Sequence, residues 1–386
     1  MRTRGALATM VPALLAVVCM QSSNTQAEEN TESQLAAAVN AAAPLTFQLS
    51  TESTEAQMAE TRAYWTPERL ANAQPMLPTV NENAVTPEAA PQGSGPPVSL
   101  PGKRPTVTSN DSSATQLYDP AQAQIQPEAG GIEPQAMGTF GAPYTTTLVS
   151  PLETRYPYRT VGKLFFTGNT GGNFVCSASV LRPRIVVTAG HCVHRGSGGV
   201  GGFHRNFLFV PAFSMGAAPL GTFTPRQVGT TSQWATGGGG VPNAADFGMF
   251  EMNDRASVKI GSITGFLGFR TLSLIPNHTT KLGYPGNISS GQKMIQVFSQ
   301  SFRTTNPNNV EYGSNARGGS SGGPWAMNFA HVPATPTTSM NAVVGVTSYG
   351  YASTAPQVQG SSIPDSRAGG FIPLLNTMCA LRAGNC

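Results

Sequence analysis

From Tyr144 to the C-terminus, the chain is broken into short β-branched and aromatic runs separated by Gly, Pro and Asn. Many short runs with turn residues between them are typical of an all-β barrel or sandwich. One short helix is expected in this half, at about 374–382. The expected strands are Thr160–Thr167, Asn173–Leu181, Arg184–Ala189, Asn206–Pro211, Asp246–Met252, Lys281–Tyr284, Lys293–Phe302, Ala342–Ser348 and Gly369–Pro373.

Residues 28–137 differ in composition from the rest of the chain. They hold 13 acidic and 4 basic residues, a net charge of −9, whereas residues 138–386 hold 6 acidic and 17 basic residues, a net charge of +11. The acidic segment is rich in Pro, Gln, Ala and Thr and has no sustained apolar period, so it cannot bury much of a core. We expect it to be largely disordered, with short helices at 32–39 and 55–70. Opposite charge favours its association with the basic half, so we interpret it as a removable pro-segment, with a solvated linker as the alternative.

The N-terminus has the pattern of a secretory leader. Met1-Arg2-Thr3-Arg4 is followed by an apolar run that ends near Met20 and by a small residue, Ala27, at a cleavage position. We therefore predict a signal peptide over 1–27 and a secreted, extracellular product; a lipoprotein acylated at Cys19 is the alternative. The apolar run is too short to cross a bilayer, and no later segment is apolar for 18 residues, so no membrane contact is expected.

Four cysteines follow the leader, an even number that indicates disulfides in an oxidising compartment. Three pairings are possible, and we favour Cys176 with Cys192 and Cys379 with Cys386. Zinc binding by Cys192, His191 and His194 is the alternative, but no paired C-x-x-C or H-E-x-x-H motif accompanies them. We expect no metal and no other cofactor. The basic residues are scattered singly, so nucleic acid is not an expected partner.

Two short motifs carry residues suited to hydrolysis. Gly319-Ser320-Ser321-Gly322-Gly323 satisfies the pattern G-x-S-x-G, and Thr188-Ala189-Gly190-His191-Cys192 supplies a histidine upstream. The order of the acid, base and nucleophile decides between fold families. No carboxylate followed by a histidine lies after Ser321, and no Asp of the basic half precedes His191. These facts exclude the α/β-hydrolase and subtilisin orders and leave His, Asp, Ser, with Asp246 as the acid.

The motifs in this order resemble those of the chymotrypsin-like serine proteases. Cys176 stands 15 residues before His191, the spacing of the disulfide beside that family's histidine. Two further stretches are closer to the secreted microbial glutamyl endopeptidase-like branch than to animal trypsins, namely Val161–Phe166 and Gly283–Gly286. Four stretches match the family's histidine motif, aspartate strand, serine loop and substrate-pairing strand, in that order: Thr188–Cys192, Ala245–Phe250, Gly319–Pro324 and Val346–Gly350.

The resemblance implies a role for each residue. His191 would act as general base and then as general acid, Asp246 would orient it, and Ser321 would be the nucleophile. The backbone N–H groups of Gly319 and Ser321 would form the oxyanion hole. Asp254 is the alternative to Asp246, and Ser320 is the alternative to Ser321. The implied substrate-binding positions are Asn315, Ala316, Thr347, Ser348, Tyr349 and Gly350, whereas the histidines interpreted as surface or structural residues are His194, His204, His278 and His331.

The chain departs from the family at two places. Ser320 stands where animal zymogens carry the Asp that receives a new N-terminal ammonium, so we expect release of the pro-segment, not N-terminal insertion, to relieve inhibition. Asn315 stands at the pocket base where trypsin has Asp, and Thr347 stands where glutamyl endopeptidases have His. Neither an Arg/Lys preference nor a Glu preference is therefore predicted, although Asp365 and Arg367 could reach the pocket.

Together these observations predict a secreted, monomeric serine endopeptidase that acts on proteins or peptides. Its protease domain is expected over 138–386, as two antiparallel six-stranded β-barrels at about 144–258 and 259–386, with a short C-terminal helix and with the acidic segment as an internal partner. Two alternatives stay open. One is a catalytically silent, protease-like binding protein, and the other is an esterase that uses the same triad.

Overall fold

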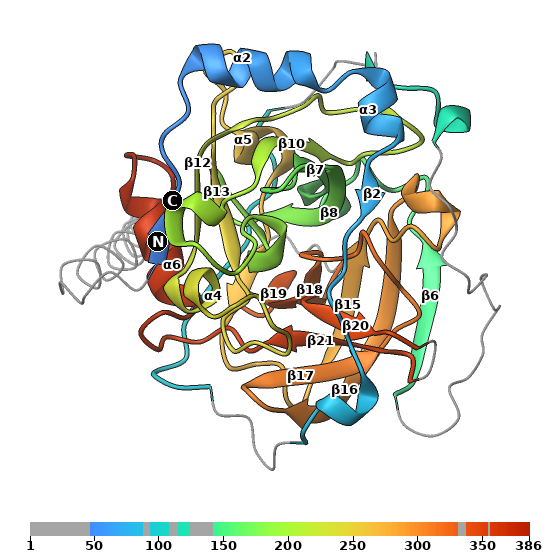
Figure 1. Ribbon diagram of the computed structural model, residues 1–386, viewed down its shortest axis with the longest axis vertical. Coiled ribbons are helices and arrows are strands. Elements are labelled where there is room, and N and C mark those ends of the chain that lie inside the picture. The colour runs from blue at the N-terminus through green and yellow to red at the C-terminus, as the bar shows by residue number, and fades with distance from the viewer. Residues whose placement is uncertain (1–46, 88–92, 108–114, 124–141, 331–336, 354–355) are drawn as a thin grey trace, which may run out of the picture. The chain divides into compact units, whose positions relative to one another are not determined.

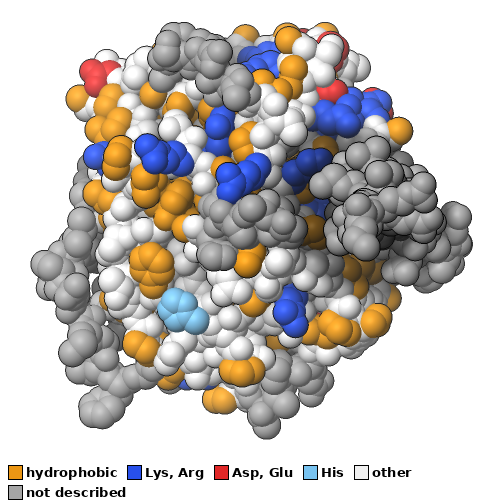
Figure 2. Space-filling view, turned by 180° about the vertical axis from the view of Figure 1, so that it is seen from behind, with side chains coloured by type: hydrophobic (Ala, Val, Ile, Leu, Met, Phe, Trp, Pro, Cys, Tyr) orange, Lys and Arg blue, Asp and Glu red, His pale blue; other side chains and the backbone are white. Residues whose placement is uncertain are grey.

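The computed structural model describes residues 47–87, 93–107, 115–123, 142–330, 337–353 and 356–386, and two curved sheets dominate them (Figure 1). The predicted signal peptide at 1–27, the helix expected at 32–39 and His331 lie outside the described residues. No helix among the described residues is long and apolar enough to cross a membrane. On the face drawn in Figure 2, Lys and Arg side chains outnumber Asp and Glu, in keeping with the basic composition of the second half.

The first sheet contains six strands from the basic half of the chain, in the spatial order β12, β13, β9, β8, β7 and β10. Each of these neighbours pairs antiparallel. Phe209 of β10 also bridges Phe223, just before β12, which curls the sheet toward closure. The bounds are β7 (Val161–Thr167), β8 (Asn173–Val180), β9 (Ile185–Thr188), β10 (Arg205–Pro211), β12 (Pro225–Thr231) and β13 (Gly248–Met252).

The second sheet has the spatial order β20, β21, β17, β16, β15, β18, β19 and β14, with β6 also paired to β16. Its pairs are antiparallel except β14 with β19, which is parallel. The bounds are β6 (Tyr144–Leu148), β14 (Gly268–Arg270), β15 (His278–Gly283), β16 (Ile295–Thr305), β17 (Asn309–Gly313), β18 (Pro324–Met327), β19 (Ala342–Val346), β20 (Tyr349–Tyr351) and β21 (Val358–Ser362).

The two ends of the basic half each join the more distant barrel. β6 pairs with β16 over its whole length, so residues 144–148 belong to the second sheet, and the expected range of the first barrel, 144–258, needs correction at its start. Helix α6 (Phe371–Ala380) lies at the other end of the chain, yet Phe371 and Leu374 pack into the core of the first barrel with Phe247. Each end joins the barrel whose apolar surface it covers, whatever its place in the chain.

The expected strands overlap strands of the structure except at Gly369–Pro373, and six strands of the second sheet were not predicted: β6, β14, β17, β18, β20 and β21. Residues 369–373 open helix α6, where Pro373 fits because the first turn of a helix has no intrahelical use for its N–H group. Two short helices, α4 (Ser232–Thr236) and α5 (Ile260–Thr264), were not predicted. Both are five residues long, too short to leave an amphipathic period in the sequence.

The acidic segment was expected to be largely disordered, and that expectation does not hold for its described residues. Helices α2 (Glu55–Tyr64) and α3 (Pro67–Ala71) begin at the capping residues Thr54 and Thr66, whose side chains accept backbone N–H bonds. Short strands add to the two sheets: β1 (Phe47–Leu49) to β12, β2 (Gln74–Pro75) to β8, β3 (Thr79–Val80) to β20, and β4 (Ser99–Leu100) to β14. β5 (Thr115–Gln116) pairs with β11 (Ala217–Ala218) in a separate two-stranded sheet.

The acidic segment is therefore ordered by packing against the core of the basic half. Trp65 is 6% exposed, packs against Phe165 and donates its indole N–H to the Asn206 carbonyl at 2.6 Å. Leu70 is also buried, in the same apolar cluster. Low hydrophobicity rules out an independent core, but it does not rule out edge pairing with a neighbouring sheet.

Candidate active site

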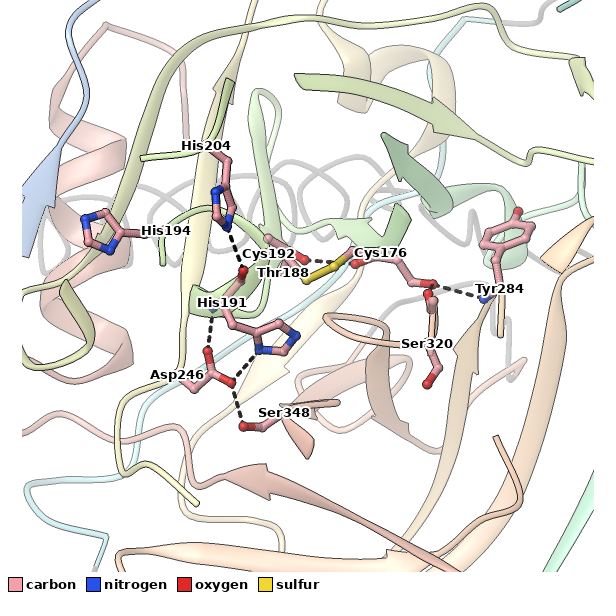
Figure 3. The surroundings of a disulfide bond; sticks show 12 residues. Cys176, Thr188, His191, Cys192, His194, His204, Asp246, Tyr284, Ser320 and Ser348 are labelled. Carbon is pink, nitrogen blue, oxygen red and sulfur yellow. Dashed lines mark hydrogen bonds and ion pairs between the residues drawn. A yellow bond between two sulfur atoms is a disulfide. The ribbon is translucent and has the colours of Figure 1, made fainter. Parts of the chain in front are cut away.

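His191 and Asp246 lie side by side at the ends of two neighbouring strands (Figure 3). His191 sits in a 3-10 turn that follows β9, and Asp246 precedes β13, which pairs with β9. Asp246 Oδ2 contacts His191 Nδ1 at 2.8 Å, while Asp246 Oδ1 accepts the His191 backbone N–H at 2.8 Å. The carboxylate thus fixes both the position of the residue and the orientation of its ring, with Nε2 left for other chemistry.

Asp246 is fully buried, and the Ser348 hydroxyl is one of the donors that replace solvent around its carboxylate. The Ser348 hydroxyl donates to Asp246 Oδ2 at 2.6 Å, and the Asp246 backbone N–H donates to Ser362 Oγ at 3.3 Å. A buried carboxylate is stable when such donors satisfy its lone pairs. The side chain of Ser348, a predicted substrate-binding position, thus contacts Asp246.

A second histidine, His204, is hydrogen-bonded to the backbone of His191. His204 Nδ1 accepts the Asn169 N–H at 3.0 Å, so its Nε2–H is free to donate to the His191 carbonyl at 3.1 Å (Figure 3). Burial lowers the pKa of His204 to about 4, which keeps its ring neutral near pH 7. The sequence interpretation of His204 as a structural residue fits this arrangement.

Ser321 lies in a tight turn before β18 that needs glycine at two positions. Gly319 has φ +92° and Gly322 has φ +75°, in the left-handed region that L side chains rarely adopt. A Cβ on Gly319 would lie 2.5 Å from the Tyr284 carbonyl oxygen, and one on Gly322 would lie 1.9 Å from Thr188 Oγ1. The turn therefore presses against both barrels at once and is held between them.

Ser177 of β8 fixes this turn, and sequence reasoning missed it. Its hydroxyl donates to the Gly319 carbonyl at 2.8 Å and accepts the Tyr284 N–H at 3.0 Å. Its backbone N–H donates to the Ser321 carbonyl at 2.7 Å. A fully buried serine in the middle of a predicted strand gives no signal in the sequence, because its role depends on a turn 142 residues away in the chain.

The two groups that would exchange a proton are both buried. His191 is 5% exposed and Ser321 is 0% exposed. Within the described part of the chain, neither His191 Nε2 nor Ser321 Oγ has a hydrogen-bond partner. Catalytic hydrogen bonds are often made only once substrate is bound, so their absence leaves both residues as candidates.

Ser320, the alternative nucleophile, is occupied. Its hydroxyl donates to the Arg317 carbonyl at 2.7 Å and accepts from Gln359 Nε2 at 2.8 Å.

Asp254, the alternative acid, forms a bidentate ion pair with Arg184 and does not contact His191. Asp365 pairs with Arg367 at 2.8 Å, and the Arg367 guanidinium also donates to the Ala244 carbonyl. Gln359 is a second structural residue that no motif had indicated.

The predicted substrate-binding stretch turns most of its side chains inward. Thr347 Oγ1 accepts the Trp325 indole N–H at 2.9 Å, and the Tyr349 hydroxyl donates to the buried carboxylate of Glu311 at 2.9 Å. Thr347 is 2% exposed and Tyr349 is fully buried, so neither side chain is exposed to a ligand. Asn315 Oδ1 accepts from Thr146 at 2.6 Å, and the Ala316 carbonyl accepts from Gln359.

Both favoured cysteine pairs are disulfides in the structure, Cys176–Cys192 and Cys379–Cys386. The first ties β8 to the turn that holds His191 (Figure 3). In the described ranges, the one group of side chains with the spacing of metal ligands is Cys176, His191 and Cys192. Its thiols are bonded to each other, so this group does not fit a metal ion.

No protein-family model matches the chain. Its relatives include the glutamyl endopeptidase of Bacillus licheniformis, 26% identical over 177 residues that cover 44% of this chain and 49% of the relative. The matched part thus spans about half the length of that protein. Another relative, from Bacillus subtilis, is named an extracellular metalloprotease and is 23% identical over 251 residues, 60% of this chain and 75% of the relative.

Solved structures similar to this chain include the protease Anisep from Arthrobacter nicotinovorans, at a TM-score of 0.49 and 28% identity, covering 57% of this chain and 96% of that one. A second is AL20, a thermostable serine protease from an extremophilic microorganism, at a TM-score of 0.47 and 26% identity, covering 56% and 94% of the two chains.

Proposed function

We propose that this chain is a serine endopeptidase and that it belongs to the chymotrypsin-like serine proteases related to glutamyl endopeptidases. Ser321 is its nucleophile, His191 its general base and acid, and Asp246 the residue that orients the histidine. The observation that carries the proposal is the double contact of Asp246 with His191, through the ring and the backbone of the same residue. A histidine oriented in this way has one ring nitrogen committed to the acid and the other available to a serine.

The chemistry follows in two steps. As Ser321 Oγ bonds to the carbonyl carbon of a substrate, its proton passes to His191 Nε2. The tetrahedral intermediate expels the amine, which takes that proton and leaves Ser321 acylated. Water then attacks the ester, gives a proton to Nε2, and frees the acid product and the Ser321 hydroxyl. The imidazolium formed in each step lies beside the Asp246 carboxylate, whose negative charge stabilises it.

The turn around Ser321 supplies the electrostatic part of catalysis. Negative charge develops on the substrate oxygen, and the N–H groups of Gly319 and Ser321 are the proposed donors to it. Ser177 restrains both ends of this pair, because it bonds the carbonyl of each residue. Donors that are fixed before the reaction need no reorganisation as charge develops.

Substrate preference is proposed to be independent of a charged pocket. Asn315 and Ala316 are neutral, and the Thr347 side chain is bound to Trp325 inside the barrel. We infer that neither an acidic nor a basic residue before the cleaved bond is required. The chain is further proposed to be secreted and to be synthesised with 28–137 as its pro-segment.

An active-site serine phosphonylating reagent tests the assignment. The secreted protein, recovered in its processed form, should be labelled at Ser321 and should hydrolyse a protein substrate. Ser321→Ala should abolish both signals, and the matched control Ser320→Ala should keep them. A folded, processed protein that is not labelled would identify a silent binding protein, and hydrolysis of esters without peptides would identify an esterase.

A further inference from the structure

Residues 74–80 of the acidic segment run past the turn that contains Ser321. The Met76 N–H donates to the Val175 carbonyl of β8 at 3.0 Å, and the Met76 carbonyl accepts the Gly319 N–H at 2.9 Å. Gly319 N–H is the group proposed above to bind the developing oxyanion of a substrate. A carbonyl of the chain itself therefore takes the place of the substrate carbonyl oxygen on one of the two donors.

The same segment then follows the strand predicted to pair with substrate. The Gly350 N–H of β20 donates to the Pro78 carbonyl at 3.1 Å, and the Ala352 N–H donates to the Val80 carbonyl at 3.0 Å. Strand β3 is thereby added to β20, with Gly350 opposite Thr79. Main-chain pairing of this kind binds an extended peptide largely without regard to its side chains.

Side chains of the segment fill the space above the two glycines. Leu77 Cδ2 lies 2.9 Å from the position that a Cβ on Gly350 would occupy, and Pro75 Cβ lies 3.5 Å from the corresponding position on Gly319. Val80 is 6% exposed and packs in an apolar cluster with Tyr349 and Tyr351. These contacts accompany the nearly complete burial of His191 and Ser321.

We propose that residues 74–80 are a built-in inhibitor that occupies the substrate groove in the direction opposite to a cleavable peptide. The proposal rests on the proposed endopeptidase function for its consequence, but the binding of the segment to the groove is independent of catalysis.

The direction in which residues 74–80 run explains why the segment is not cleaved. In hydrolysis, the residues after the bound carbonyl leave as an amine that takes a proton from His191, so they must lie on the His191 side of the groove. Here the residues before Met76 lie on that side: β2 runs parallel to β8 at Phe174–Val175, next to the disulfide that joins Cys176 to the residue after His191. The residues after Met76 lead away along β20.

The hydrogen bonds at the oxyanion donors also indicate that the segment is not bound as a cleavable substrate. Among the backbone hydrogen bonds of the described residues, Met76 takes the Gly319 N–H but not the Ser321 N–H. A productive carbonyl accepts from both. Pro75 and Pro78 flank this position and hold the segment extended, which restricts any adjustment toward a cleavable pose.

Amide hydrogen exchange on the full-length chain tests the binding without using activity. In a Ser321→Ala background, peptides that contain Gly319 and Gly350 should exchange slowly. Changing both Met76→Pro and Leu77→Gly removes the N–H bond to Val175 and the Leu77 contact, so exchange at both glycines should accelerate about tenfold or more. Thr79→Ala, an exposed side chain in the same strand, is the matched control and should change neither.

Labelling tests the inhibitory consequence. With Ser321 restored and the chain shown to be uncut, the Met76→Pro, Leu77→Gly protein should react with a serine phosphonylating reagent about tenfold faster than the parent or the Thr79→Ala protein. Equal exchange and equal labelling in all three would overturn the proposal, as would cleavage of the parent at the Met76–Leu77 bond. If exchange changes as expected but no form is ever labelled, the groove binding stands and the endopeptidase assignment fails.

Discussion

The Ser348 hydroxyl donates to Asp246 Oδ2 at 2.6 Å, and this is the oxygen that also contacts His191 Nδ1. The strand expected to bind substrate is therefore joined to the acid of the proposed triad through a side chain. Ser348 belongs to the second barrel, whereas His191 and Asp246 belong to the first. The bond ties the proposed triad across the two barrels, in addition to the contacts of the Ser321 turn.

Loss of this bond should weaken catalysis more than substrate binding. Ser348→Ala leaves Asp246 with one fewer donor and loosens the ring that it orients. We expect kcat to fall about tenfold to a hundredfold, with a much smaller change in KM, since hydrogen bonds to a charged group contribute about 1.5–3 kcal/mol. Steady-state kinetics of the processed enzyme measures both values. Ser339→Ala, in the partly exposed turn between β18 and β19, is the control, and equal kcat values for the two variants would contradict the role of Ser348.

Gly319 should not tolerate a side chain. Gly319→Ala combines φ +92° with a Cβ placed 2.5 Å from the Tyr284 carbonyl oxygen, so the turn must shift and carry its N–H donor with it. Loss of one oxyanion donor costs about 10²–10³ in kcat. Gly240→Ala is a matched control, because its backbone is not left-handed and no atom lies within 4 Å of the added Cβ. Parallel assays should separate the two variants by at least about a hundredfold.

The two disulfides should contribute unequally to stability. Their cysteines are separated by 16 and 7 residues in sequence, and the loop-entropy model gives about 3 kcal/mol for the longer loop and about 0.7 kcal/mol less for the shorter. Urea unfolding of the Cys176→Ala, Cys192→Ala protein and of the Cys379→Ala, Cys386→Ala protein measures both. Only the first pair adjoins His191, so only its removal should also lower kcat. A larger loss of activity in the second variant would refute this assignment.

Stability should rise with pH above neutrality because of a buried lysine. Burial lowers the pKa of Lys163 to about 7, and its ammonium donates to the Gly291 carbonyl at 2.9 Å. Between that value and the ordinary lysine pKa, the unfolded chain binds the proton and the folded chain does not. The free energy of unfolding should therefore increase by about 1.4 kcal/mol per pH unit from this group.

Urea unfolding of the Ser321→Ala protein between pH 7 and pH 9 measures that slope without autolysis. Lys163→Met should remove the share of the slope that belongs to Lys163. The buried Lys281, whose pKa is also lowered by burial, should leave a residual slope. Lys293→Met, at a partly exposed side chain, is the control. An unchanged slope in Lys163→Met would show that this amine is charged in the folded state.

The sequence predicted the regular parts of the fold because their causes are local. Strands such as β7 and β9 are continuous β-branched or aromatic runs, and they lie where the runs are. His191 and Asp246 were paired by motif order, and they lie in contact, while their catalytic roles stay predictions. β6 was assigned to the wrong barrel, since its partner β16 lies about 150 residues further along the chain.

Charge was a poor guide to how the acidic segment binds. The opposite net charges suggested electrostatic attraction, and Glu52 does pair with Arg226. Most of the described contacts are instead backbone pairing and apolar burial, as at Trp65 and Val80. Net charge counts residues, whereas edge pairing depends on which N–H and C=O groups a sheet leaves unpaired, and no composition reports that.

The exchange of ends between the barrels has a consequence for how the protein is made. Phe371 and Leu374 of α6 complete the core of the first barrel, so that core cannot close until α6 has left the ribosome. The first barrel emerges early but must wait, with its apolar surface incompletely covered, for a helix that follows the whole second barrel in the chain. Translation that stops short of α6 would therefore spoil the half of the molecule that was synthesised first.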